Sequence, residues 1–297
     1  MDIRHSPIFR GVATALITPF RGGAIDYDAL AHLIEFQIEG GIDALVIAGT
    51  TGEPSTLTDE EHRRLLRFAA EQVAGRVPMI AGTGSNDTRH AAELSRFACE
   101  CGYQALLVVT PYYNKASDEG LIQSYRYIAD NVGRPIILYN VPARTGVKIS
   151  MPVYRALAEH PNIVAVKEAS GDLGAAARLI AELGHKLTVY SGNDDVTVPL
   201  LSLGGIGTIS VLSNLMPKEV SAMCHSYFSG DVKTAAAEQL RLLPLIDALF
   251  AEVNPIPVKF AAARMGLCRE EYRLPLCSPS FATKSRITEA MAGVGLL

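Results

Sequence analysis

Lys167 is the residue whose neighbours point most directly to chemistry. It follows the apolar run 163–166 (Ile-Val-Ala-Val), which is typical of a buried strand, and precedes Glu168. Burial disfavours the charged form of an amine, so a lysine at the end of such a strand is a candidate nucleophile for Schiff-base formation. From this run alone the alternative stays open, a lysine that points into solvent or pairs with Glu168.

Hydroxyl groups follow other strand-like runs. Tyr139 ends one run, while Thr50 and Tyr113 follow two others. Tyr139 could exchange protons with a carbinolamine at Lys167, but a phenol is a weak acid at neutral pH and needs a relay. Thr50 and Tyr113 could supply that relay. A single residue of this kind at a strand end most often has only a structural role. The functional interpretation therefore rests on the presence of all of them at strand ends.

Two groups could bind carboxylates. The turn 49–52 (Gly-Thr-Thr-Gly) offers backbone N–H groups and hydroxyls to a small anion. Arg144 offers a two-pronged guanidinium, although it could also be a surface charge. The five cysteines and seven histidines show no metal-ligand spacing, and no carboxylate cluster joins the strand ends, so we expect no metal. An amine with hydroxyl partners and no metal favours imine chemistry on a carbonyl substrate.

Eight strand-like runs alternate with amphipathic segments along the chain. The runs are 12–17, 42–48, 77–81, 104–109, 135–139, 163–167, 187–191 and 206–210. The helical segments are 27–39, 59–73, 88–101, 117–131, 152–159, 173–183, 196–203 and 217–228. Eight such units predict an α/β protein with a (β/α)8 TIM barrel, whose chemistry lies at the carboxyl ends of the strands. A doubly wound sheet is the alternative, but no dinucleotide fingerprint is present.

The strand signals stop near residue 230. Segments 235–253, 257–265 and 279–292 read as helices. We therefore predict a catalytic barrel over residues 1–230 and a C-terminal helical domain over residues 231–297.

The bulk composition excludes several classes of function. The 297 residues include 27 basic and 31 acidic side chains, for a net charge of −4, which gives no electrostatic basis for binding nucleic acid or an anionic membrane. No apolar stretch reaches the ~20 residues of a membrane span, and residues 1–5 do not begin a secretory h-region. We expect a cytoplasmic protein.

The strand-end segments together resemble a known family. They are 49–53 (GTTGE), 110–114 (TPYYN), 139–146 (YNVPARTG) and 167–169 (KEA), with 254–259 (NPIPVK) in the helical tail. They are similar to the dihydrodipicolinate synthase and N-acetylneuraminate lyase family of pyruvate-dependent class I aldolases, and the similarity runs essentially end to end. The resemblance implies a lyase of the carbon–oxygen class that uses no cofactor beyond a covalent Schiff base with pyruvate at Lys167.

The resemblance also implies a role for each site residue. The pyruvate enamine on Lys167 would attack L-aspartate 4-semialdehyde, a step of diaminopimelate and lysine biosynthesis. Tyr139, Thr50 and Tyr113 would form the proton relay. Tyr113 would reach in from the partner subunit of a homodimer, which is usually paired into a homotetramer. The substrate-binding residues would be Thr51, Arg144, Gly192 and Ile209.

An inhibitory L-lysine site is common in this family. The matching positions here are Ser55, Asp59, His62, Asn86, His90 and Tyr112. Lysine-sensitive members usually have histidine where Asp59 stands and glutamate where His90 stands. Because this chain lacks that acidic partner for the amino group of lysine, we predict weak or absent inhibition by L-lysine.

Two other functions are alternatives to the condensation of pyruvate with L-aspartate 4-semialdehyde. A lyase for N-acetylneuraminate or a 2-keto-3-deoxy sugar acid has less use for a cation at Arg144 and usually has serine at position 50, so Arg144 with two threonines favours aspartate semialdehyde. The other candidate is a catalytically silent binding protein. The joint presence of the nucleophile and all three relay residues argues against it.

Overall fold

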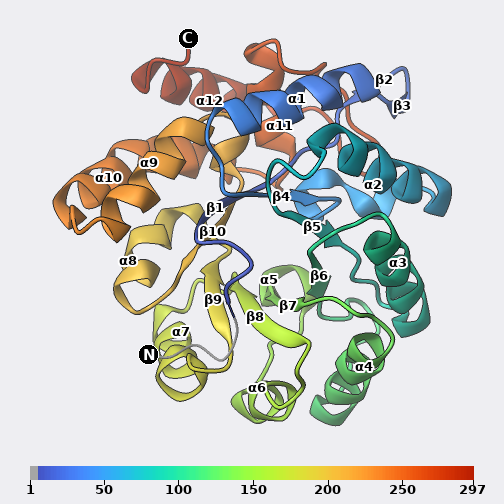
Figure 1. The fold of residues 1–297 in the computed structure, drawn as a ribbon. Coiled ribbons are helices and arrows are strands. Elements are labelled where there is room, and N and C mark those ends of the chain that lie inside the picture. The colour runs from blue at the N-terminus through green and yellow to red at the C-terminus, as the bar shows by residue number, and fades with distance from the viewer. Residues whose placement is uncertain (1–5) are drawn as a thin grey trace.

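A closed barrel of eight parallel strands forms the centre of the molecule (Figure 1). The computed structural model describes residues 6–297, so the prediction about a secretory segment at residues 1–5 lies outside the described residues. The barrel strands are β1 (Gly11–Ala15), β4 (Ala44–Ile47), β5 (Met79–Gly82), β6 (Ala105–Val109), β7 (Ile136–Asn140), β8 (Ile163–Glu168), β9 (Thr188–Ser191) and β10 (Gly207–Ser210). β1 pairs with both β4 and β10, which closes the sheet. The predicted (β/α)8 barrel is confirmed.

Helices surround the barrel, as Figure 1 shows. They are α1 (Tyr27–Glu39), α2 (Asp59–Val73), α3 (Thr88–Glu100), α4 (Asp118–Asp130), α6 (Met151–Leu157), α7 (Leu173–Leu183), α8 (Thr197–Ser202) and α9 (Pro217–Phe228). The bounds of α1, α2, α7 and α9 are the predicted ones. For α2 the reason is local: the Thr58 hydroxyl accepts from the N–H of Glu61, and the Glu61 carboxylate accepts from the N–H of Thr58. This capping box fixes the start of the helix.

Two apolar cores lie on the two faces of the sheet. One lies between the strands and the helices. The other fills the inside of the barrel and includes Ile80, Leu107, Ile137, Tyr139 and Ile209. Alternate residues of each strand point to opposite faces, so most strands contribute apolar side chains to both cores. Because side chains fill the barrel, a ligand can enter only at its mouth.

Several short elements were not predicted. They are the hairpin β2 (Phe20–Arg21) and β3 (Ala24–Ile25), the helix α5 (Pro142–Thr145), and the 3-10 turns η1 (Thr50–Gly52), η2 (Pro54–Thr56), η3 (Asp194–Val196) and η4 (Leu212–Asn214). All are too short, at two to four residues, for a repeating hydrophobic pattern to reveal them. Most of them follow the barrel strands at their carboxyl ends, where they shape the mouth.

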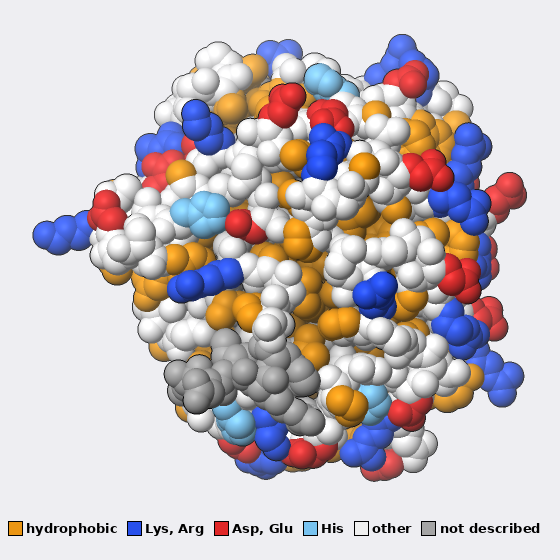
Figure 2. Space-filling model, viewed as in Figure 1, with side chains coloured by type: hydrophobic (Ala, Val, Ile, Leu, Met, Phe, Trp, Pro, Cys, Tyr) orange, Lys and Arg blue, Asp and Glu red, His pale blue; other side chains and the backbone are white. Residues whose placement is uncertain are grey.

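The C-terminal segment consists of α10 (Val232–Leu249), α11 (Ile256–Arg264) and α12 (Phe281–Gly293). The predicted boundary after residue 230 lies between α9 and α10, and α10 packs against both α9 and α12. None of the helices in residues 6–297 is long and apolar enough to span a membrane. On the face shown in Figure 2, acidic and basic side chains are intermixed around the margin of the molecule.

Candidate active site

Lys167 lies inside the mouth of the barrel. It is the fifth of the six residues of β8, one position before the end of the strand, and is only 5% exposed. The neighbouring strand places Tyr139 directly opposite Lys167, and the Lys167 Nζ lies 4.5 Å from the centre of the Tyr139 ring. The alternative of a solvent-directed lysine is therefore wrong.

Glu168 does not form the alternative ion pair with Lys167 either. Its side chain accepts from Asn140 Nδ2 (2.8 Å) and from the N–H of Ser170 (2.7 Å). These bonds hold the carboxylate on the outer side of the strand, away from its neighbour, since successive residues point to opposite faces. The amino group of Lys167 is left facing the mouth.

A cavity of about 820 Å³ opens above Lys167. Five of the predicted site residues line it: Lys167, Tyr139, Thr51, Arg144 and Gly192. Its other walls come from the segments after β7, β8, β9 and β10 and from the stretch between the last turn of α10 and Asn254. This is the position at which barrel enzymes carry their chemistry.

Gly192 lies against the lysine. A Cβ atom at this position would come within 3.0 Å of Lys167 Cε and within 2.5 Å of Ala169 Cβ. A glycine is therefore required here, because a larger residue would displace the nucleophile or the strand end that carries it.

Asn254 joins two of the predicted substrate-binding residues. Its Nδ2 donates to the Thr51 hydroxyl (3.0 Å), and its backbone carbonyl accepts from Arg144 Nη2 (2.9 Å). The sequence indicated Asn254 only as part of a motif, because a contact between residues 203 positions apart leaves no local signal. Asn254 therefore orients both a hydroxyl and a guanidinium of the cavity.

Asp194 is a second residue of the cavity that was not predicted from the sequence. Its Oδ2 accepts from the N–H groups of Val211 and Leu212, each at 2.9 Å. Its Oδ1 and the Oδ1 of Asn254 accept no hydrogen bond from residues 6–297. Burial raises the pKa of the Asp194 carboxyl. Two residues that line the cavity therefore each carry a buried acceptor oxygen without a partner among the described residues.

Thr50 lines a second, smaller cavity of about 270 Å³. Arg144 and Val141 line both cavities, so the two are neighbours. Four of the positions predicted for L-lysine also line the smaller cavity: Ser55, His62, His90 and Tyr112. Of the other two, Asp59 contacts His90 (3.0 Å), and the Asn86 carbonyl accepts from Asn114. Burial lowers the pKa of His62 to about 4, so this imidazole is neutral at pH 7.

Two of the predicted residues lie elsewhere. Tyr113 lines neither of these two cavities and is 92% exposed. Ile209 is fully buried inside the barrel, in the same apolar cluster as Tyr139, so it supports the site from within the core.

Three residues with a strained backbone lie at the mouth of the barrel. Ala48, Glu53 and Tyr113 follow β4 and β6 and have φ angles of 55°, 54° and 70°. Residues other than glycine rarely adopt this left-handed conformation, and such strain is common at binding and catalytic sites. Within residues 6–297, no three histidine, cysteine, aspartate or glutamate side chains are grouped as a metal site would require.

Comparisons with known proteins agree with this geometry. The family model described as "Dihydrodipicolinate synthetase family" matches residues 8–292. A 4-hydroxy-tetrahydrodipicolinate synthase of Geotalea uraniireducens is 48% identical over 98% of this chain and 100% of its own length. The crystal structure of dihydrodipicolinate synthase from Aquifex aeolicus has a TM-score of 0.95 at 42% identity, covering 97% of this chain and 99% of that one.

A second solved structure is also similar to this chain. It is described as the first monomeric dihydrodipicolinate synthase variant, with a TM-score of 0.95 at 41% identity over 98% of both chains. The matches therefore cover the barrel, the site and the C-terminal helices together. The chain belongs to the dihydrodipicolinate synthetase family.

Proposed function

We propose that the protein condenses pyruvate with L-aspartate 4-semialdehyde, the reaction of a 4-hydroxy-tetrahydrodipicolinate synthase in diaminopimelate and lysine biosynthesis. The observation that carries the proposal is the Lys167 amino group, buried at the mouth of the barrel and facing the ring of Tyr139. A buried amine beside a phenol is suited to imine formation with a keto acid.

The covalent steps follow from the chemistry of an amine and a ketone. Lys167 Nζ attacks the carbonyl carbon of pyruvate, and loss of water leaves a C=N bond. Loss of a proton from the methyl carbon gives an enamine, which forms a C–C bond to the aldehyde carbon of the semialdehyde. The amino group of the semialdehyde then attacks the imine carbon, closes the ring and releases Lys167. No external oxidant, reductant or cofactor enters these steps.

Proton transfer in these steps is assigned to hydroxyl groups. Tyr139 stands opposite Lys167 in the sheet and is placed to exchange protons with the carbinolamine. Thr50 begins the turn beside Thr51 and would pass the proton onward. Tyr113 would complete the relay.

The two carboxylates have separate binding groups in this proposal. The turn from Thr50 to Gly52, with the Thr51 hydroxyl oriented by Asn254, would bind the carboxylate of pyruvate. Arg144, oriented by the Asn254 carbonyl, would bind the carboxylate of the semialdehyde.

The exposed position of Tyr113 supports a homo-oligomer. Tyr113 is 92% exposed and has a strained backbone, and an exposed aromatic side chain in such a conformation is typical of an interaction site. We propose that it enters the site of a partner subunit in a homodimer, or in a homotetramer built from such dimers. A cytoplasmic location is part of the same proposal, as expected for an enzyme of amino-acid biosynthesis.

Turnover assays with competing substrates test the proposed function. We expect pyruvate to be consumed with L-aspartate 4-semialdehyde, and no comparable release of pyruvate from N-acetylneuraminate or a 2-keto-3-deoxy sugar acid. Cleavage of a sugar acid at a rate equal to or above that of the condensation would contradict the proposal and favour the lyase.

A further inference from the structure

We infer that the buried ion pair between Glu53 and Lys259 is a positioning device that sets the Thr50–Gly52 turn, so that the C-terminal helices control the affinity for pyruvate. This inference deepens the proposed function and rests on it.

The pair is fully enclosed. Lys259 Nζ donates to Glu53 Oε1 at 2.5 Å, and both side chains are 0% exposed. Lys259 lies in α11, and Glu53 lies 206 residues earlier, directly after η1. A charge buried without its partner is strongly destabilising, so each residue depends on the other.

The environment of Lys259 leaves Glu53 as the principal partner of its charge. The Nζ lies 4.2 Å from the centre of the Phe20 ring and 5.3 Å from that of Tyr272. Burial lowers the pKa of Lys259, and the Glu53 carboxylate opposes this shift. The aromatic faces favour a cation at this position but cannot replace a carboxylate.

Glu53 itself has few other bonds at its side chain. Its Oε2 is buried and accepts no hydrogen bond from residues 6–297. Its backbone, in contrast, is central to the turn: the N–H donates to the carbonyl of Thr50 (3.2 Å) and φ is 54°. Since this left-handed conformation is unfavourable for glutamate, a strong side-chain anchor is needed to maintain it. Lys259 supplies that anchor.

The same turn is held at a second point by the C-terminal segment. Asn254, which bonds the Thr51 hydroxyl, comes two residues before α11 begins. One end of α11 thus orients Thr51, and Lys259 within it orients Glu53. A shift of α11 relative to the barrel would move both Thr51, within the turn, and Glu53, directly after it.

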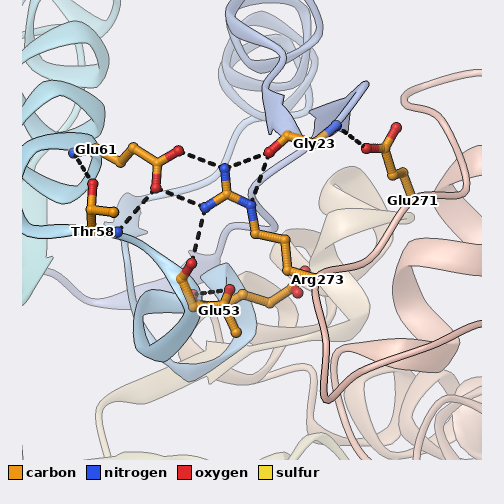
Figure 3. A network of polar contacts seen from close by, with 7 residues as sticks. Gly23, Glu53, Thr58, Glu61, Glu271 and Arg273 are labelled. Carbon is orange, nitrogen blue, oxygen red and sulfur yellow. Dashed lines mark hydrogen bonds and ion pairs between the residues drawn. The ribbon is translucent and has the colours of Figure 1, made fainter.

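A third set of contacts joins the C-terminal segment to the barrel loops, further from the ion pair (Figure 3). Arg273 donates to the carbonyl of Thr56 (2.9 Å), to the Glu61 carboxylate and to the carbonyl of Gly23. Glu271 accepts from the N–H of Gly23 on the other side. These contacts fasten the C-terminal segment to the loops after β1 and β4, so the ion pair is the inner part of a continuous connection.

The test compares variants of the pair in the full-length protein. Lys259→Met removes the cation, Glu53→Gln removes the anion, and the double variant leaves no unpaired charge. The readout is the pyruvate concentration that gives half-maximal borohydride trapping on Lys167, with the KM values for both substrates and the melting temperature measured alongside. Lys284→Met is the matched control, because Lys284 also pairs with a glutamate, Glu270 (2.7 Å), and faces a ring, that of Phe260, within the C-terminal segment.

We expect Lys259→Met and Glu53→Gln each to raise the half-saturating pyruvate concentration by about tenfold or more. The KM for the semialdehyde should change much less, and Lys284→Met should match the wild type. If Lys259→Met does not fold, the double variant is measured in its place, because it carries no isolated buried charge. It should fold and still require about tenfold more pyruvate.

Three results would overturn the inference. The first is a folded single variant whose half-saturating pyruvate concentration equals that of the wild type. The second is a double variant in which this concentration returns to the wild-type value. The third is a Lys284→Met variant in which it rises as much as in the variants of the pair. Recovery in the double variant would mean that the pair only balances charge. Absence of any pyruvate adduct on the wild-type protein is a different outcome, which would refute the proposed function itself.

Discussion

The amino group of Lys167 faces the ring of Tyr139 across two paired strands, with Nζ 4.5 Å from the ring centre. The backbone register of β7 and β8 sets this relationship, so it does not depend on a mobile loop. The apolar filling of the barrel lies directly below, because Tyr139 belongs to the inner cluster. The nucleophile and its proposed proton carrier are therefore fixed relative to each other before substrate binds.

Replacing Tyr139 by phenylalanine keeps this packing and removes the hydroxyl. We expect turnover to fall by about 10²-fold or more, as is typical when a positioned proton carrier is lost. Tyr103→Phe is the control, because the Tyr103 hydroxyl donates to the Leu66 carbonyl away from the site (3.0 Å). That variant should lose about 1 kcal/mol of stability without losing turnover. Equal turnover in Tyr139→Phe and wild type would remove Tyr139 from the relay.

Gly192→Ala tests how closely the site is built around the nucleophile. The added methyl group would lie 3.0 Å from Lys167 Cε and 2.5 Å from Ala169 Cβ, so the lysine or the strand end that carries it must shift. We expect the rate of pyruvate adduct formation to fall by about tenfold or more, measured by borohydride trapping over time. Gly133→Ala, where the new methyl group meets no atom within 4 Å, should react like the wild type. Identical rates in the two variants would show that the contact does not constrain Lys167.

The Glu61–Arg273 pair predicts a loss of stability in acid. The bond from Arg273 lowers the pKa of Glu61 from 4.5 to about 2. A carboxyl with a lowered pKa in the folded state stabilises the fold above its unfolded pKa, and this contribution is lost as pH falls from about 4.5 towards 2. The stability difference between wild type and Glu61→Gln should therefore shrink as pH falls from about 4.5 towards 2, measured by urea unfolding. A difference that is constant with pH would contradict this assignment.

Inhibition by L-lysine should be weak or absent. Asp59 and His90 occupy the positions at which sensitive members usually have histidine and glutamate, and here the two side chains contact each other at 3.0 Å. The Asp59 carboxylate is thus already engaged, and position 90 offers no negative charge to an ammonium group. A titration of turnover with L-lysine checks this. Half-inhibition at a submillimolar concentration would show that the site still accepts lysine.

The sequence predicted the parts of the fold that depend on local patterns. The eight apolar runs correspond to the eight barrel strands, and a helix such as α2 begins where Thr58 and Glu61 form a capping box. The apolar run before Lys167 predicted the strand but left open whether the lysine is buried, and β8 continues one residue further than predicted. Tyr139, Arg144 and Gly192 come together in one cavity because strand ends converge in a barrel.

The sequence could not predict contacts between distant segments. Asn254 bonds Thr51 and Lys259 bonds Glu53 over more than 200 positions, and no local pattern specifies such pairs. The strained turn at Glu53 was also missed, because glutamate gives no signal for a left-handed backbone. The role of Tyr113 stays a prediction, since it depends on a partner subunit.

The reactivity of Lys167 is the central claim, and trapping with pyruvate tests it most directly. The protein is incubated with pyruvate and reduced with borohydride, and the modified residue is located by mass spectrometry of its peptides. We predict one reduced pyruvate adduct per chain, on Lys167, and none in Lys167→Ala. An unmodified Lys167, or full turnover by Lys167→Ala, would contradict the account.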